Sequence, residues 1–97
     1  MIHILKTDSE FFRASWHGDK PFEIRDNDRN FKVEDLLYLF ETQYSGTEMK
    51  EGKPLVYTGG LLVVKVRYIL KGPFHKLAEN GVVMTVDKMH MYQPKEN

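Results

Sequence analysis

The segment from Leu61 to Lys71, Leu-Leu-Val-Val-Lys-Val-Arg-Tyr-Ile-Leu-Lys, decides the fold. Apolar and basic side chains alternate along it with a period of two, which is typical of a β-strand with one buried face. The apolar positions are Leu62, Val64, Val66, Tyr68 and Leu70, and the basic ones are Lys65, Arg67 and Lys71. We therefore predict a strand whose Val64, Val66 and Tyr68 side chains face the core.

Three more segments have the composition or alternation of strands. They are Ile2–Lys6, Pro21–Arg25 and Val82–Tyr92. Residues 33–41 fit a helix face as well as a strand, and we predict a strand. The density of Gly, Ser, Thr, Lys and Glu predicts a long polar connection over 42–60. One helical turn is expected over 74–80 and a frayed tail over 93–97.

A helix is predicted from Ser9 to His17. Phe11, Phe12 and Trp16 recur in it at helical spacing, and Gly18 stands where a left-handed C-terminal cap is expected. We expect these aromatic rings in the core rather than on a base-stacking surface. Four or five strands with one or two short helices predict an α+β domain built on a curled, mostly antiparallel sheet or small β-barrel.

Length and charge limit the functions that the chain can have. Its 97 residues suit one domain, and 14 basic residues balance 14 acidic ones. A non-specific nucleic-acid or membrane binder would carry a net charge, so any anion binding must be local. The chain has no cysteine, its histidines lack ligand spacing, and no apolar run approaches the roughly 20 residues of a membrane span. We expect a cytoplasmic protein without metal, cofactor or membrane segment.

The candidate site is the octet Gly18–Arg25, Gly-Asp-Lys-Pro-Phe-Glu-Ile-Arg. In an extended backbone Phe22 and Ile24 share one face, and Glu23 and Arg25 share the other. We predict that the apolar pair is buried and that the charged pair faces a groove, with Lys20 close by. The alternative is a structural ion-pair cluster of the kind common on solvated faces.

This octet resembles the Gly-x-Lys-x-x-Glu-x-Arg motif of the ASCH domains, a group within the PUA-like superfamily that is associated with RNA and nucleotide metabolism. Four further blocks are similar to a small ASCH-like family found in phages and bacteria. These blocks are His3–Lys6, Asn27–Phe31, Asp35–Leu39 and Tyr57–Gly59. The resemblance implies one PUA-like β-barrel domain over residues 1–97, with flanking helices and a cleft that holds the motif.

Three functions remain open. A binding module would recognise RNA, a nucleotide or a modified nucleoside with the side chains of Lys6, Lys20, Glu23, Arg25 and Arg29, and the basic face of the 61–71 strand would contact the nucleic-acid backbone. An enzyme acting on a nucleoside or amide would use Lys20 and Glu23 as catalytic groups. The acetylcytidine amidohydrolase of the superfamily is similar at Gly18, Lys20 and Arg25 but has threonine in place of Glu23. A phage-type protein would bind a host protein through the 42–60 connection.

Overall fold

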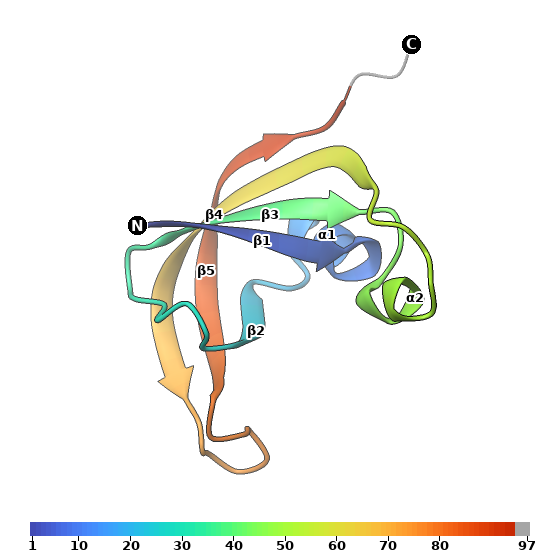
Figure 1. Ribbon diagram of the computed structural model, residues 1–97. Helices are drawn as coiled ribbons and strands as arrows, with labels where there is room; N and C mark the ends of the chain where they lie inside the picture. The colour runs from blue at the N-terminus through green and yellow to red at the C-terminus, as the bar shows by residue number, and fades with distance from the viewer. Residues whose placement is uncertain (95–97) are drawn as a thin grey trace.

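The computed structural model describes residues 1–94, which form five strands and two short helices (Figure 1). In chain order these are β1 (Ile2–Asp8), α1 (Ser9–Trp16), β2 (Phe22–Asp26), β3 (Leu36–Thr42), α2 (Gly46–Lys50), β4 (Tyr57–Lys71) and β5 (Gly81–Tyr92). The predicted α+β class is confirmed, as is a strand within 33–41. The end of the predicted frayed tail, 95–97, lies outside the described residues.

The sheet is a curled half-barrel. Its strand order is β1-β3-β4-β5-β2, with β1 and β3 parallel and the other neighbours antiparallel. Figure 1 shows β4 and β5 bending strongly, so that their lower halves turn away from the direction of β1 and β3. The bend brings β2 beneath β1, but in the described chain these two strands are the edges of the sheet. We call the space between the two edges the seam.

A β-bulge in β4 changes which side chains face inward. Val66 pairs with Val86 and Tyr68 with Thr85, so two residues of β4 oppose one residue of β5 at this point. Because the extra residue reverses the alternation, Val66 is fully buried whereas Tyr68 is 63% exposed. The prediction that Tyr68 faces the core was therefore wrong, although the strand itself is confirmed.

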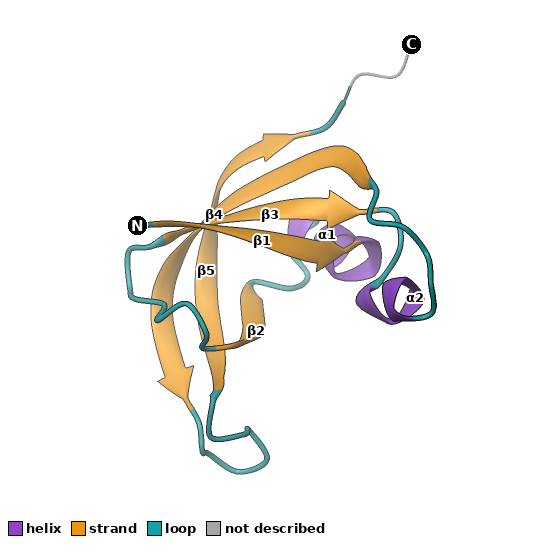
Figure 2. Cartoon of the chain, in the orientation of Figure 1, coloured by secondary structure: helices purple, strands orange, loops and turns teal. Residues whose placement is uncertain are grey.

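The core lies on the concave side of the half-barrel and is closed by α1. Its buried apolar residues come from β1, β3, β4, β5, α1 and the loop before β3, and include Leu5, Phe12, Phe31, Leu37, Leu39, Leu62, Val64 and Met84. Trp16 packs half-buried against this cluster, but Phe11 is exposed, contrary to prediction. Figure 2 shows both helices at the end of the sheet where β1 and β3 finish.

The connections differ from prediction in three places, the first being that β4 begins at Tyr57, within the predicted 42–60 connection. Helix α2 lies inside the predicted polar connection, and Ser45 and Glu48 form a capping box at its start. Residues 74–80 form no helix; Phe74 and Leu77 instead make an isolated bridge in the turn between β4 and β5. The left-handed backbone predicted at Gly18 is confirmed by a φ of +85°.

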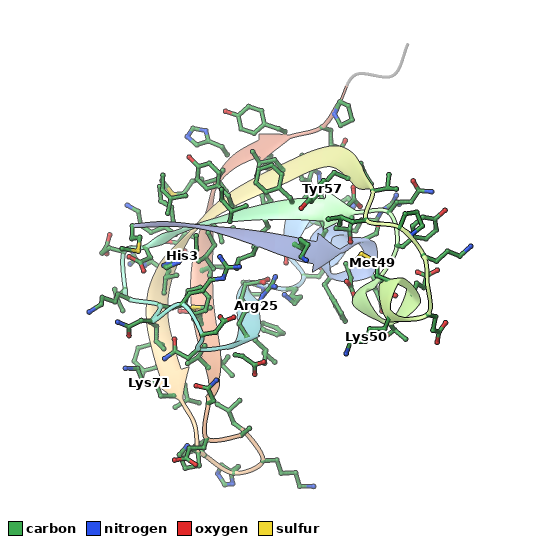
Figure 3. All side chains as sticks on the ribbon, viewed as in Figure 1. His3, Arg25, Met49, Lys50, Tyr57 and Lys71 are labelled. Carbon is green, nitrogen blue, oxygen red and sulfur yellow. The ribbon has the colours of Figure 1, made fainter. Side chains whose placement is uncertain are left out.

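Asp35 joins the start of β1 to the start of β3. His3, labelled in Figure 3, lies with its Nε2 atom 2.8 Å from the Asp35 carboxylate, and the backbone N–H of Lys32 donates to the same oxygen at 3.0 Å. Burial raises the pKa of the Asp35 carboxyl, but the hydrogen bonds from His3 and Lys32 help to bring that pKa below its ordinary value.

Candidate functional site

Glu23 is a buried carboxylate held between two cations. The residue is 1% exposed, and Lys20 Nζ lies 2.5 Å from its Oε2 atom. Its other oxygen, Oε1, accepts hydrogen bonds from Arg25 Nε at 3.1 Å and from Arg25 Nη2 at 2.9 Å. A buried carboxylate without such partners would be strongly destabilising, so the two cations allow Glu23 to face inward.

The end of α1 brings Lys20 to this carboxylate. The helix stops at Trp16, and the left-handed backbone of Gly18 turns the chain back, so that the N–H of Lys20 donates to the carbonyl of Ala14 at 3.1 Å. Lys88 Nζ donates to the carbonyl of Trp16 at 2.9 Å and supports the same turn. The Lys20 side chain therefore starts from a fixed position beside β2.

Arg25 connects the two edges of the half-barrel across the seam. From β2, its Nη1 atom donates to the carbonyl of Lys6 at 3.1 Å and its Nη2 atom donates to the hydroxyl of Thr7 at 3.1 Å, both on β1. The side chain is only 24% exposed. One guanidinium thus links the buried carboxylate to the opposite strand, in place of the backbone hydrogen bonds that would close a barrel.

A pocket of about 480 Å³ opens at the seam over these groups. It is lined by Lys6, Thr7, Asp8, Phe11, Lys20, Phe22, Glu23, Ile24 and Arg25. Its size falls within the range of small-molecule sites. Lys20 and Arg25 lie over the buried Glu23, while Phe11, Phe22 and Ile24 add apolar surface, with Phe11 and Ile24 47% and 59% exposed. The pocket therefore combines apolar walls with three cations, Lys6, Lys20 and Arg25, and with the carboxylates of Asp8 and Glu23.

A smaller pocket of about 220 Å³ lies on the other side of Arg25. It shares Lys6 and Arg25 with the first pocket and also contains Arg29. Arg29 is half-exposed, with its Nε atom 3.9 Å from the neighbouring Asp28 carboxylate. The structure thus brings Lys6, Lys20, Glu23 and Arg25 to one pocket and places Arg29 beside it.

The orientation predicted for β2 was wrong for Ile24 and Glu23, whereas Arg25 does line a pocket. Ile24 was expected to be buried, yet it is largely exposed at the seam, and Glu23 was expected in an open groove, yet it lies beneath Lys20 and Arg25. The side chains of β2 do alternate between two faces, but the face with Glu23 turns inward because Lys20 and Arg25 neutralise its carboxylate. Sequence reasoning also missed Phe11 as a pocket residue, since the recurrence of Phe11, Phe12 and Trp16 along the helix predicted core positions for all three.

Two of the basic side chains predicted to form one face of β4, Lys65 and Arg67, lie close to carboxylates. Lys65 Nζ lies 3.6 Å from a Glu34 carboxylate oxygen, and Arg67 Nε lies 3.3 Å from an Asp87 carboxylate oxygen. These pairs weaken the case for a nucleic-acid backbone contact there. Within residues 1–94 no cluster of three His, Asp or Glu side chains is arranged to hold a metal ion. None of the helices in this part is long and apolar enough to cross a membrane.

The fold and the site define a small α+β half-barrel domain with a pocket at its open seam. Residues 2–86 match the model of a family described as a domain of unknown function, DUF3850, and the chain belongs to this family. No curated protein matches the sequence.

Proposed function

We propose that this chain is an ASCH-type, PUA-like domain that binds RNA or a nucleotide by holding one nucleobase in the 480 Å³ seam pocket. The observation that carries the proposal is the meeting of Lys20 and Arg25 over one buried carboxylate, in a pocket that two aromatic side chains also line. It agrees with the Gly-x-Lys-x-x-Glu-x-Arg resemblance of the same octet.

The walls of the pocket suit a flat ring. The aromatic side chains of Phe11 and Phe22 and the aliphatic side chain of Ile24 line it. Unpaired bases stack on such surfaces, and stacking contributes about 1–3 kcal/mol for each base. A nucleobase therefore gains contact area here that an inorganic anion does not gain.

The charges of the pocket suit a ligand with carbonyl or phosphate oxygens. Lys20, Glu23 and Arg25 together carry one net positive charge, and the only carboxylate of the three has both its oxygens bonded to the cations. Glu23 thus acts as a positioning residue that fixes the two donors. Lys6, which lines both pockets, and Arg29, which lines the smaller one, would bind a phosphate attached to the bound nucleoside.

A nucleoside-acting enzyme that uses Lys20 and Glu23 is the second proposal, and the geometry favours it less. The Lys20 ammonium lies 2.5 Å from Glu23 and also donates to the carbonyl of Phe22 at 2.8 Å. To act as a nucleophile or base it would have to leave both partners. Glu23, which is 1% exposed, would in turn have to release two cations to reach a substrate.

The test is a titration of the wild-type chain with nucleosides, nucleotides and short RNAs at two salt concentrations. Lys20→Ala and Arg25→Lys should each weaken binding about tenfold or more, because each removes a donor directed at the ligand. Lys76→Ala, which removes an exposed lysine from the turn after β4, is the matched control and should leave affinity unchanged.

The same titration separates the proposals. For a binding module, Lys20→Ala lowers affinity and its salt dependence, because one ionic contact is lost. For an enzyme, the wild type converts a member of the panel and Lys20→Ala removes turnover while retaining much of the affinity. If the wild type binds no member of the panel, the nucleic-acid proposal is wrong and a host protein becomes the partner to test.

A further inference from the structure

Hydrogen bonds at the two ends of β2 determine which of its backbone groups pair with β5. The N–H of Val86 donates to the carbonyl of Pro21 at 3.1 Å, and the N–H of Asn27 donates to the carbonyl of Asn80 at 2.8 Å. The register between these two pairs is unbroken. Since bonded pairs alternate with non-bonded pairs along an antiparallel ladder, the odd-numbered residues of β2 bond to β5. The even-numbered residues direct their N–H and C=O groups into the seam.

Phe22 and Ile24 are the even-numbered residues of β2 that line the larger pocket. The carbonyl of Phe22, which has the same direction, accepts a hydrogen bond from Lys20 Nζ at 2.8 Å, as a group facing the seam should. The backbone of Ile24 therefore presents one donor and one acceptor side by side to the pocket. An unpaired strand edge of this kind can bind either an added strand or the edge of a base.

The hydrogen bonding of β1, the opposite edge of the seam, disfavours the addition of an extended peptide strand there. The N–H of Leu36 donates to the carbonyl of Met1 at 2.9 Å, so in the parallel ladder the even-numbered residues of β1 also face the seam. There the carbonyl of Lys6 is already occupied by Arg25, whose side chain crosses from β2. An extended peptide running along the seam would have to displace Arg25. A single ring in the pocket on one side of Arg25 leaves that contact intact.

Each of the two cations retains one N–H for a ligand. A guanidinium has five N–H donors, and four of those of Arg25 bond to Glu23, Lys6 and Thr7 within the described chain. An ammonium has three, and two of those of Lys20 bond to Glu23 and Phe22. The pocket thus offers the Ile24 N–H and the Ile24 carbonyl side by side, and its lining also includes Arg25, whose remaining N–H is on Nη1 beside the Lys6 carbonyl.

We infer that the seam pocket selects a pyrimidine-2,4-dione, the ring of uracil, by hydrogen bonds from the Ile24 backbone and Arg25. The Ile24 N–H and carbonyl require an acceptor beside a donor on the ligand, and the Arg25 N–H requires a further acceptor; the carbonyl, N3–H and carbonyl of uracil supply this set. Cytosine has a bare ring nitrogen and an amino group in two of these positions, and guanine places an amino group against Arg25. The inference rests on the proposed function and adds the identity of the base.

The ligand-side test compares uridine, cytidine and 3-methyluridine in titrations of the wild-type chain. Uridine should bind at least tenfold more tightly than either of the other two. The N3-methyl group removes the donor that pairs with the Ile24 carbonyl and leaves that carbonyl buried without a partner. This comparison changes only the ligand, so it does not depend on the folding of any variant.

The protein-side test uses proline on the free edge. Ile24→Pro removes an N–H that faces the seam and leaves the ladder with β5 intact, which is where an edge strand tolerates proline. It should weaken uridine binding at least fivefold. Ile24→Ala, which keeps the N–H and removes only apolar surface from the pocket wall, should weaken uridine binding less than Ile24→Pro does. Ile4→Pro, which removes a seam-facing N–H of β1 at a residue outside the pocket lining, should have no effect on affinity.

The outcomes separate this inference from the proposed function. Equal affinities for the three nucleosides would overturn the selection of uracil while leaving base binding in place. Absence of binding to every nucleoside and RNA would overturn both. If Ile24→Pro does not fold, the comparison of uridine with 3-methyluridine in the wild type decides the matter.

Discussion

Replacing Glu23 by glutamine should destabilise the fold more than its small change in shape suggests. The carboxylate accepts one hydrogen bond from Lys20 and two from Arg25, and hydrogen bonds to charged groups contribute about 1.5–3 kcal/mol each. Glutamine keeps an acceptor for Arg25 but directs an NH₂ group at the Lys20 ammonium. Both cations are partly exposed and can turn towards water, which offsets part of the loss. We expect a cost of about 3 kcal/mol.

That cost is measurable by urea and thermal denaturation. Trp16, the single tryptophan, is half-buried against the core and reports unfolding by its fluorescence. For a domain of this size, about 3 kcal/mol corresponds to a fall in Tm of about 12–24 °C. Glu79→Gln makes the same chemical change at an exposed carboxylate and should cost less than about 0.5 kcal/mol. If the two variants are equally stable, Glu23 is not the buried anchor of the site.

Two further predictions concern stability. Asp35→Asn should lower the free energy of unfolding by about 1–3 kcal/mol at pH 7. The pKa of Asp35 is lowered in the folded state, so its contribution is present above the unfolded value near 4 and is lost as the pH falls through the lower folded value. The difference in free energy of unfolding between wild type and Asp35→Asn should therefore become smaller below about pH 4. A difference that does not change with pH would contradict the stabilising role of the ionised Asp35 carboxylate. Val66→Ala should cost about 1–2 kcal/mol more than Lys65→Ala, because Val66 is fully buried; equal costs in urea titrations would contradict the inward direction of Val66.

The strands and the first helix were predictable because the spacing of apolar residues and the residues that end each element are local features of the sequence. The strand at 61–71 was found from its period of two, and the helix at 9–17 from its spacing and from Gly18. The bulge near Arg67 has no sequence signal of its own, so Tyr68 was assigned to the wrong face. Helix α2 did have a signal, the Ser-x-x-Glu capping box at Ser45, which the polar composition of its surroundings concealed.

The residues of the site were easier to predict than their directions. The octet brought Lys20, Glu23 and Arg25 together in the sequence, and the structure places them in contact. Alternation shows which side chains share a face, but it does not show which face is buried. Apolar side chains are usually buried and carboxylates exposed, but here Glu23 is buried and Ile24 is exposed. This orientation is stable because the folded chain pairs the Glu23 carboxylate with Lys20 and Arg25, which the alternation pattern does not show.

Amide chemical shifts in a ¹⁵N-labelled sample, recorded while the tightest-binding nucleoside or RNA of the panel is added, test the location of the ligand most directly. A base in the seam pocket should shift the amides of residues 22–25 on β2, 6–8 on β1 and 20 in the turn before β2, all of which line it. Those of the turn between β4 and β5 should not move. Shifts confined to the outer face of β3 and β4, or none at millimolar ligand, would contradict a nucleobase site at the seam.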